Sequence, residues 1–252
     1  MNKLIIALLA FASISYSVAS GGSVSLDHAD IDLSDKESLQ RGAANYINYC
    51  YGCHSLDYVR YNRIASDLDL TESQVVDYLI FDESKYASLM ENAIVDADAK
   101  KWFGATPPDL TMVNRIKGSP DWVYTYLKGF YKDDARPWGV NNSVFPDVGM
   151  PHVLYELQGL CEHAPISEDH IVYDSLSDNQ THESGCEEFA VKGSMSDEEF
   201  DEFVLDLTNF IAYVGEPWKL KSHKIGKWVI FYLLILLVFS VAYYRELWKD
   251  VH

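Results

Sequence analysis

Cys50-Tyr51-Gly52-Cys53-His54 is the most informative stretch of the sequence, because two cysteines two residues apart and followed by histidine form the attachment signature of c-type haem. The thiols add to the two porphyrin vinyl groups, and the next residue presents an imidazole to the iron. A bare CxxC also fits half of a zinc site or a thioredoxin-like redox pair. Cys161 and Cys186 lack the spacing of a second zinc pair, and no βαβ pattern typical of a redox dithiol is visible. The motif therefore predicts one haem c, bound covalently through Cys50 and Cys53, with His54 as an axial ligand.

A six-coordinate haem needs a second axial ligand, and a thioether sulfur would raise its reduction potential. Besides the histidines, the candidates are Met90, Met112, Met150 and Met195. Met150 lies between Gly149 and Pro151, which favour an irregular loop that presents one side chain. Met90 and Met112 fit ordinary core packing, and Met195 fits a surface position beside a helix cap. The residues alone leave the choice open.

Both ends of the chain carry apolar segments. Residues 1–20 combine Lys3, an apolar run and small residues before Gly21, which is the form of a secretory signal peptide. Residues 225–244 are long enough to cross a bilayer and carry one charge, Lys227, so they predict a transmembrane anchor followed by a tail over 245–252. Trp228 and Tyr243 stand where interfacial aromatic residues are expected.

The orientation of the anchor depends on two conflicting signals. Four lysines, the last of them Lys227, precede the uncharged stretch 228–244, and only two basic residues follow it, which by the positive-inside rule would place the main domain in the cytoplasm. The signal peptide predicts the reverse, and a large domain translocates largely regardless of charge. We therefore expect a single-pass protein of the inner membrane, with residues 21–224 in the periplasm and the tail in the cytoplasm.

Residues 21–224 hold 36 acidic and 16 basic side chains, a net charge of −20, so clustered basic charge for binding nucleic acid is missing. Helix caps are predicted at four serines or threonines, and strand-like alternation is nearly absent. The expected caps are Ser34, Thr71, Ser119 and Ser196, with helices to about Tyr49, over Trp122–Phe130 and up to Gly215. The predicted fold is mostly α, with long loops around 100–118 and 132–150. In an oxidising compartment, Cys161 and Cys186 predict one disulfide across an acidic loop.

The order of motifs along the chain resembles the cytochrome c1 family, the haem subunit of the cytochrome bc1 (quinol–cytochrome c oxidoreductase) complex. The resemblance covers nearly the whole mature chain and is closest to proteobacterial members. It rests on Cys50–His54, Arg60-Tyr61-Asn62-Arg63, Pro107-Pro108-Asp109-Leu110, Asn141-Asn142, Gly149-Met150-Pro151-His152 and the C-terminal anchor.

The resemblance implies a class I cytochrome c-like haem domain with long loop insertions, with His54 and Met150 as the iron ligands. It also implies haem contacts from Pro108 and from the basic stretch Arg115-Ile116-Lys117. Members of the family often have arginine where this sequence has Lys117, and lysine supplies charge without a bidentate fork. Lys117 and Arg115 are both candidates for the propionate contact.

The implied function is electron transfer, not catalysis by the chain alone. The chain would accept one electron from a Rieske iron–sulfur protein and pass it to cytochrome c, in a dimeric complex with cytochrome b. Two alternatives are a membrane-anchored cytochrome of another respiratory complex and a periplasmic thiol oxidoreductase that uses Cys50 and Cys53.

Overall fold

The computed structural model describes residues 25–165, 171–173, 180–182 and 185–249. The predicted signal peptide, 1–20, and the end of the predicted tail, 250–252, lie outside the described residues. The helices are α2 (Lys36–Tyr49), α3 (Tyr61–Asp67), α4 (Glu72–Tyr78), α5 (Asp96–Phe103), α6 (Val113–Ile116), α7 (Pro120–Lys128), α8 (Tyr155–Gln158), α9 (Asp197–Gly215) and α10 (Lys219–Leu247). The strands are β1 (Leu56–Arg60), β2 (Leu89–Met90), β3 (Phe130–Lys132), β4 (Val140–Asn142), β5 (Gly159–Cys161), β6 (Ile171–Tyr173), β7 (Gln180–His182) and β8 (Phe189–Lys192).

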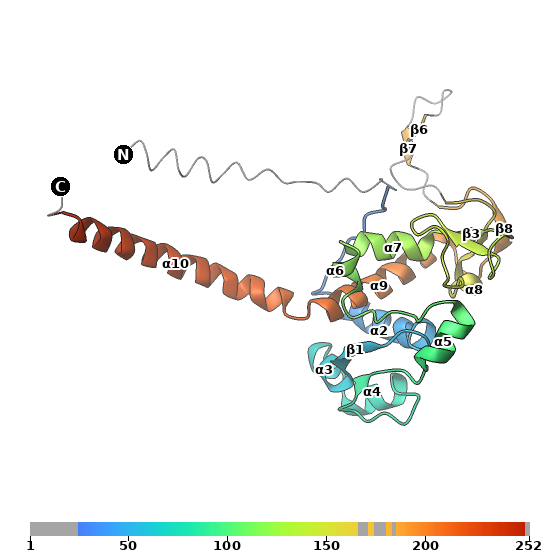
Figure 1. The fold of residues 1–252 in the computed structure, drawn as a ribbon, viewed down its shortest axis with the longest axis horizontal. Coiled ribbons are helices and arrows are strands. Elements are labelled where there is room, and N and C mark those ends of the chain that lie inside the picture. Colours follow the sequence, from blue (N-terminus) through green and yellow to red (C-terminus); the bar gives the residue numbers. More distant parts are fainter. Residues whose placement is uncertain (1–24, 166–170, 174–179, 183–184, 250–252) are drawn as a thin grey trace.

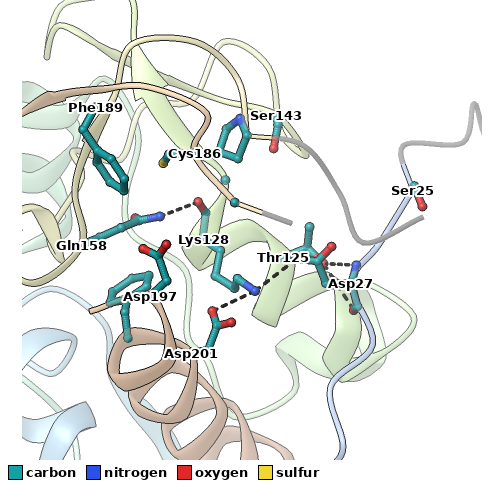
Figure 2. A pocket seen from close by; sticks show the side chains of 14 residues that line it. Ser25, Asp27, Thr125, Lys128, Ser143, Gln158, Cys186, Phe189, Asp197 and Asp201 are labelled. Atoms are coloured by element: carbon teal, nitrogen blue, oxygen red, sulfur yellow. Dashed lines mark hydrogen bonds and ion pairs between the residues drawn. The ribbon is translucent and has the colours of Figure 1, made fainter. Parts of the chain in front are cut away.

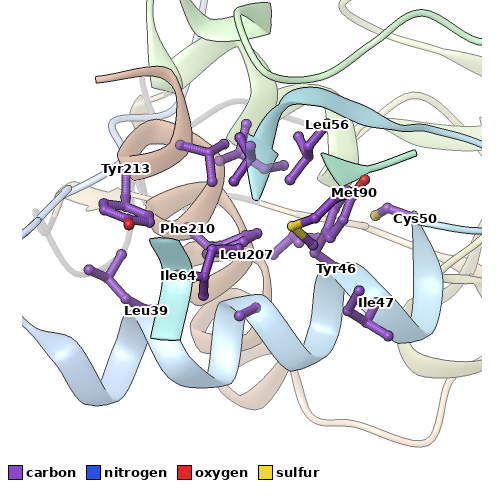
Figure 3. Packing of buried hydrophobic residues seen from close by; sticks show 14 of the residues in the cluster. Leu39, Tyr46, Ile47, Cys50, Leu56, Ile64, Met90, Leu207, Phe210 and Tyr213 are labelled. Atoms are coloured by element: carbon purple, nitrogen blue, oxygen red, sulfur yellow. The ribbon is translucent and has the colours of Figure 1, made fainter. Parts of the chain in front are cut away.

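Helices α2 and α9, far apart in the sequence, pack against each other at the centre of the domain (Figures 1 and 3). Leu39 and Tyr46 of α2 and Leu207 and Phe210 of α9 are at most 2% exposed. Removing such side chains from water stabilises a fold by about 1.5–3 kcal/mol each. Gly42 permits the close approach, because a Cβ there would lie 2.1 Å from the carbonyl oxygen of Asp206. The pair fixes where the C-terminal end of α2 lies.

Two of the four predicted helix caps are confirmed in full. The capping boxes at Thr71 and Ser196 form both of their hydrogen bonds, and α9 ends at Gly215 as predicted. Ser119 precedes Pro120 at the start of α7, but its side chain makes no capping bond. The helix ends at Lys128, earlier than predicted, because Phe130 begins β3.

The cap predicted at Ser34 is wrong by one residue. The amide and hydroxyl of Ser34 both bond to Asp32 Oδ1, at 2.8 and 2.5 Å, so this side chain is already engaged in a local turn. Asp35 caps α2 instead, and its carboxylate accepts from the Ser38 amide at 3.0 Å.

Short strands occur where the sequence indicated almost none. Strands β4, β3, β5 and β8 form one sheet in that order, in which β3 pairs with β4 antiparallel and with β5 in parallel. Each has three or four residues, too few for a period-two pattern to be recognised. The predicted loops 100–118 and 132–150 also contain the end of α5, helix α6 and strand β4.

Helix α10 extends away from the domain (Figure 1). It contains residues 225–244, and the most apolar part of the helix has none of its residues buried against the rest of the chain. The mean hydropathy of this most apolar part is 2.3, which suits a hydrocarbon environment. The helix is long and apolar enough to anchor the domain in a membrane.

Candidate haem site

The Cys50–His54 motif forms a tight turn directly after α2. Its amides continue the helical bonding pattern: Cys50 N–H donates to the Tyr46 carbonyl at 2.9 Å, and His54 N–H donates to the Cys50 carbonyl at 2.8 Å. The Tyr46 hydroxyl donates to the carbonyl of His54. Because Tyr46 is fully buried between α2 and α9, the helix pair sets the position of the motif.

The imidazole of His54 is oriented by a backbone carbonyl. His54 Nδ1 lies 2.7 Å from the carbonyl oxygen of Pro108, so Nδ1 carries the proton and the lone pair is on Nε2. Burial lowers the pKa of His54, and the Pro108 hydrogen bond opposes this shift only in part. Because the pKa is lowered, the ring is neutral at neutral pH. The Asp109 carboxylate accepts from the Asp57 amide at 2.7 Å and ties the Pro108 loop to β1, which begins just after the motif. A neutral ring with Nε2 unprotonated is the form of histidine that binds metal.

A cavity of about 330 Å³ adjoins the motif, with a mainly apolar lining. The lining residues are Tyr49, Cys50, Cys53, His54, Phe103, Ala105, Thr106, Pro107, Pro108, Leu110, Val113, Lys117, Trp122, Val123, Tyr126, Leu127, Phe145, Val148, Gly149, Met150, Pro151, Val153 and Ile211. Among the methionines of the described chain, Met150 alone is in this lining. Met90, by contrast, is fully buried in the α2–α9 core (Figure 3).

The loop that carries Met150 is held by polar side chains from the turn after β3 and from β4. Arg136 pairs with the Asp147 carboxylate at 2.8 Å and donates to the Asp147 carbonyl at 2.7 Å. The Asn141 amide oxygen accepts from the Asp147 amide at 2.9 Å, and Asn142 accepts from Val144 at 2.9 Å. The Tyr126 hydroxyl donates to Met150 Sδ at 3.4 Å. No pattern in the sequence indicated a role for Arg136 or Tyr126, and Asn141-Asn142 contributed only to the family resemblance.

The two basic candidates for a propionate contact lie in different places. Lys117 lines the cavity, and its Nζ lies 4.4 Å from the Trp122 ring centroid and 4.7 Å from that of Phe145. The Arg115 guanidinium pairs with the Glu216 carboxylate at 3.1 Å, at the C-terminal end of α9. Only Lys117 of this pair is part of the cavity wall.

The environment of Cys50 differs from that of a redox thiol. Burial raises the pKa of the Cys50 thiol to about 12, and the neighbouring Cys53 adds to the rise. Reactive cysteines have lowered pKa values and electropositive surroundings. Cys50 and Cys53 are not joined to each other, whereas Cys161 and Cys186 form a disulfide.

A second, smaller cavity of about 120 Å³ lies near that disulfide and has a different chemistry (Figure 2). Lys128 Nζ lies there between Asp201, at 2.9 Å, and Asp27, at 3.3 Å. The Lys128 carbonyl accepts from Gln158 at 2.8 Å. These contacts join α7, α9 and the N-terminal segment, and we assign them a structural role.

The main cavity fits a haem in its chemistry. Its volume is in the range of ligand sites, its wall is apolar, and it brings two thiols, a neutral imidazole and a thioether to one space. Together with the anchor helix, these features define a membrane-anchored c-type cytochrome.

Comparison with known proteins identifies the family. The model of the Cytochrome C1 family matches residues 29–251, and the chain belongs to that family. It is 46% identical to cytochrome c1 of Allochromatium vinosum, with both chains covered completely. It is 38% identical to a protein named ammonia monooxygenase gamma subunit in Nitrosomonas europaea, with 99% of this chain and 97% of that one covered. Cytochrome c1 of Rhodospirillum rubrum is 22% identical over 86% of this chain and 83% of its own length.

Family membership confirms the resemblance inferred from the motifs and establishes the cofactor class. The chain is a haem electron-transfer subunit of the cytochrome bc1 complex of a respiratory chain, and its cofactor is a c-type haem attached covalently through cysteine. It is thus an electron carrier within a larger complex, and its apolar C-terminal helix fits a membrane anchor.

Proposed function

We propose that residues 21–224 form a class I cytochrome c-like domain whose haem is bound to Cys50 and Cys53 and ligated by His54 and Met150. The observation that carries this proposal is the shared cavity: these four side chains come from two distant segments and line the same apolar space. The haem would supply one-electron chemistry, and the chain would hold it, exclude water and set its potential. The neutral Nε2 of His54 supports its assignment as a ligand.

Lys117 is the proposed partner of an acidic edge of the haem. Its ammonium lies beside two aromatic rings at the cavity wall. The ammonium is therefore already in position to pair with a propionate carboxylate of the haem. Pro108 contributes through its carbonyl, which orients His54. Arg115 stays a prediction without support from the cavity, since its guanidinium is paired with Glu216.

In the proposed electron path, the haem accepts one electron from a Rieske iron–sulfur protein and passes it to a cytochrome c. The chain would act beside cytochrome b in a dimeric complex of the inner membrane. Residues 1–20 would direct export, residues 225–244 would span the lipid, and 245–252 would face the cytoplasm. A periplasmic location would also supply the oxidising conditions in which Cys161 and Cys186 pair.

A haem stain on a denaturing gel tests the attachment, because covalently bound haem survives denaturation. We expect the full chain to stain, and the double substitution Cys50→Ser with Cys53→Ser to abolish the stain. Cys161→Ser with Cys186→Ser is the matched control, since it also removes two thiols and should keep the stain. If the unchanged chain fails to stain and a Cys50–Cys53 disulfide forms, the thiol oxidoreductase alternative replaces this proposal.

The acceptor can be tested by the dependence of the transfer rate on salt. The net charge of −20 on residues 21–224 should attract a cationic cytochrome c over a Debye length of about 30 Å at 0.01 M salt and about 8 Å at 0.15 M. We expect the second-order rate constant to fall about tenfold between these concentrations, within the range of electrostatic steering. An anionic acceptor should show the opposite trend. A rate that does not change with salt would contradict charge-steered docking.

A further inference from the structure

Tyr126 makes a specific contact with the proposed sulfur ligand. Its hydroxyl donates to Met150 Sδ with an O···S distance of 3.4 Å. Both residues line the main cavity, yet they come from different elements, α7 and the loop between β4 and α8. A thioether sulfur is a weak acceptor, so such a bond persists only where the surrounding structure holds the donor in place.

The ring of Tyr126 is held by neighbouring aromatic side chains. It stacks on Trp122 with centroids 4.9 Å apart and planes 10° from parallel, and it meets Phe130 edge-on at 5.4 Å. Pairs of this kind contribute about 0.5–1.5 kcal/mol beyond the area they bury. The orientation of the hydroxyl is therefore fixed by packing on α7 and β3 before it meets the sulfur.

The backbone of Tyr126 is tied to the same loop that carries Met150. The Asn142 side-chain amide donates to the Tyr126 carbonyl at 2.8 Å. The oxygen of that side chain accepts from the amides of Val144 and Phe145, at 2.9 and 3.1 Å, at the start of the loop. Asn142 thus links the helix that carries the Tyr126 hydroxyl to the loop that carries the Met150 sulfur. The contact between hydroxyl and sulfur is therefore held in place from both sides.

We propose that Tyr126 is a positioning residue for Met150, and that its hydrogen bond to the sulfur raises the reduction potential of the haem. The inference rests on the proposed function, because it requires Met150 to ligate the iron. A donor on one sulfur lone pair withdraws electron density from the ligand, and the positive end of the O–H dipole disfavours the more positive ferric state. Both effects favour the ferrous form.

The test is Tyr126→Phe in the full chain with its haem, which removes one oxygen and keeps the ring. We expect the ferrous-to-ferric ratio at the midpoint potential of the unchanged protein to fall about threefold, or about 28 mV at 59 mV per tenfold. The sulfur-to-iron absorption band should remain. Thermal unfolding, measured in parallel, checks that the fold is intact.

Tyr124→Phe is the matched control, because it removes a hydroxyl from the same helix. The Tyr124 hydroxyl accepts from Lys128 Nζ at 3.3 Å, so its loss should leave the redox ratio unchanged. An unchanged ratio in Tyr126→Phe, or an equal fall in both variants, would overturn the inference. Met150→Leu distinguishes a failure of the Tyr126 inference from a failure of the ligand assignment. If it abolishes the sulfur-to-iron band while Tyr126→Phe has no effect, only the role of Tyr126 fails. If the band survives Met150→Leu, the ligand assignment fails as well.

Discussion

Met150→Leu should leave the haem covalently attached and lower its reduction potential by on the order of 100 mV or more, within the roughly 0.8 V that axial ligands span. Leucine has a similar size but no lone pair, so the sixth position would pass to water or another base. The loss of a soft ligand that favours ferrous iron fixes the sign of the shift. Potentiometric titration, together with the sulfur-to-iron absorption band, provides the measurement.

The matched control is Met195→Leu. Met195 is half-buried against the α2–α9 core and lies outside the cavity wall. The same chemical change there should alter neither the potential nor the band. Equal shifts of the potential in the two variants, or a band that survives Met150→Leu, would assign the sixth ligand to another side chain.

Local signals in the sequence predicted those features whose causes are local. The boxes at Thr71 and Ser196 need only residues within one helical turn, and both form as predicted. The Ser34 cap failed for an equally local reason, since Asp32 competes for the same hydroxyl. The three- and four-residue strands carry too little pattern to be recognised.

The parts of the site that depend on distant residues could not be predicted in this way. Arg115 and Lys117 are near neighbours in sequence, and they are distinguished only in the folded chain, where Arg115 pairs with Glu216 and Lys117 lines the cavity. Pro108 acts through a carbonyl, which leaves no side-chain signal. Tyr126 occupies a helical position that fits ordinary packing, and its partner sulfur lies in a separate loop. The choice of Met150 came from the order of motifs, because its chemistry is shared with the other methionines.

Gly42→Ala should destabilise the domain, although local propensity predicts the opposite. In the interior of α2, alanine is favoured over glycine by up to about 1 kcal/mol. The added Cβ would lie 2.1 Å from the Asp206 carbonyl oxygen and 2.7 Å from Phe210 Cβ, so the two helices would have to separate. Asp206 is held to α2 by the Arg41 guanidinium, at 2.5 and 2.9 Å, which resists that movement.

Overpacking of a core costs about 1–3 kcal/mol and sometimes more, and a clash with backbone belongs to the upper end of that range. We therefore expect a net loss of about 2 kcal/mol in the free energy of unfolding, or a fall in Tm of about 4–8 °C for a domain of this size. Calorimetry of the haem-loaded protein provides the measurement. Gly226→Ala is the matched control, because a Cβ there would meet no atom within 4 Å. Separation of α2 from α9 should also disturb the haem site, since α2 leads into Cys50 and α9 contributes Ile211 to the cavity wall. An unchanged Tm in Gly42→Ala would mean that the contact between the helices is looser than the structure shows.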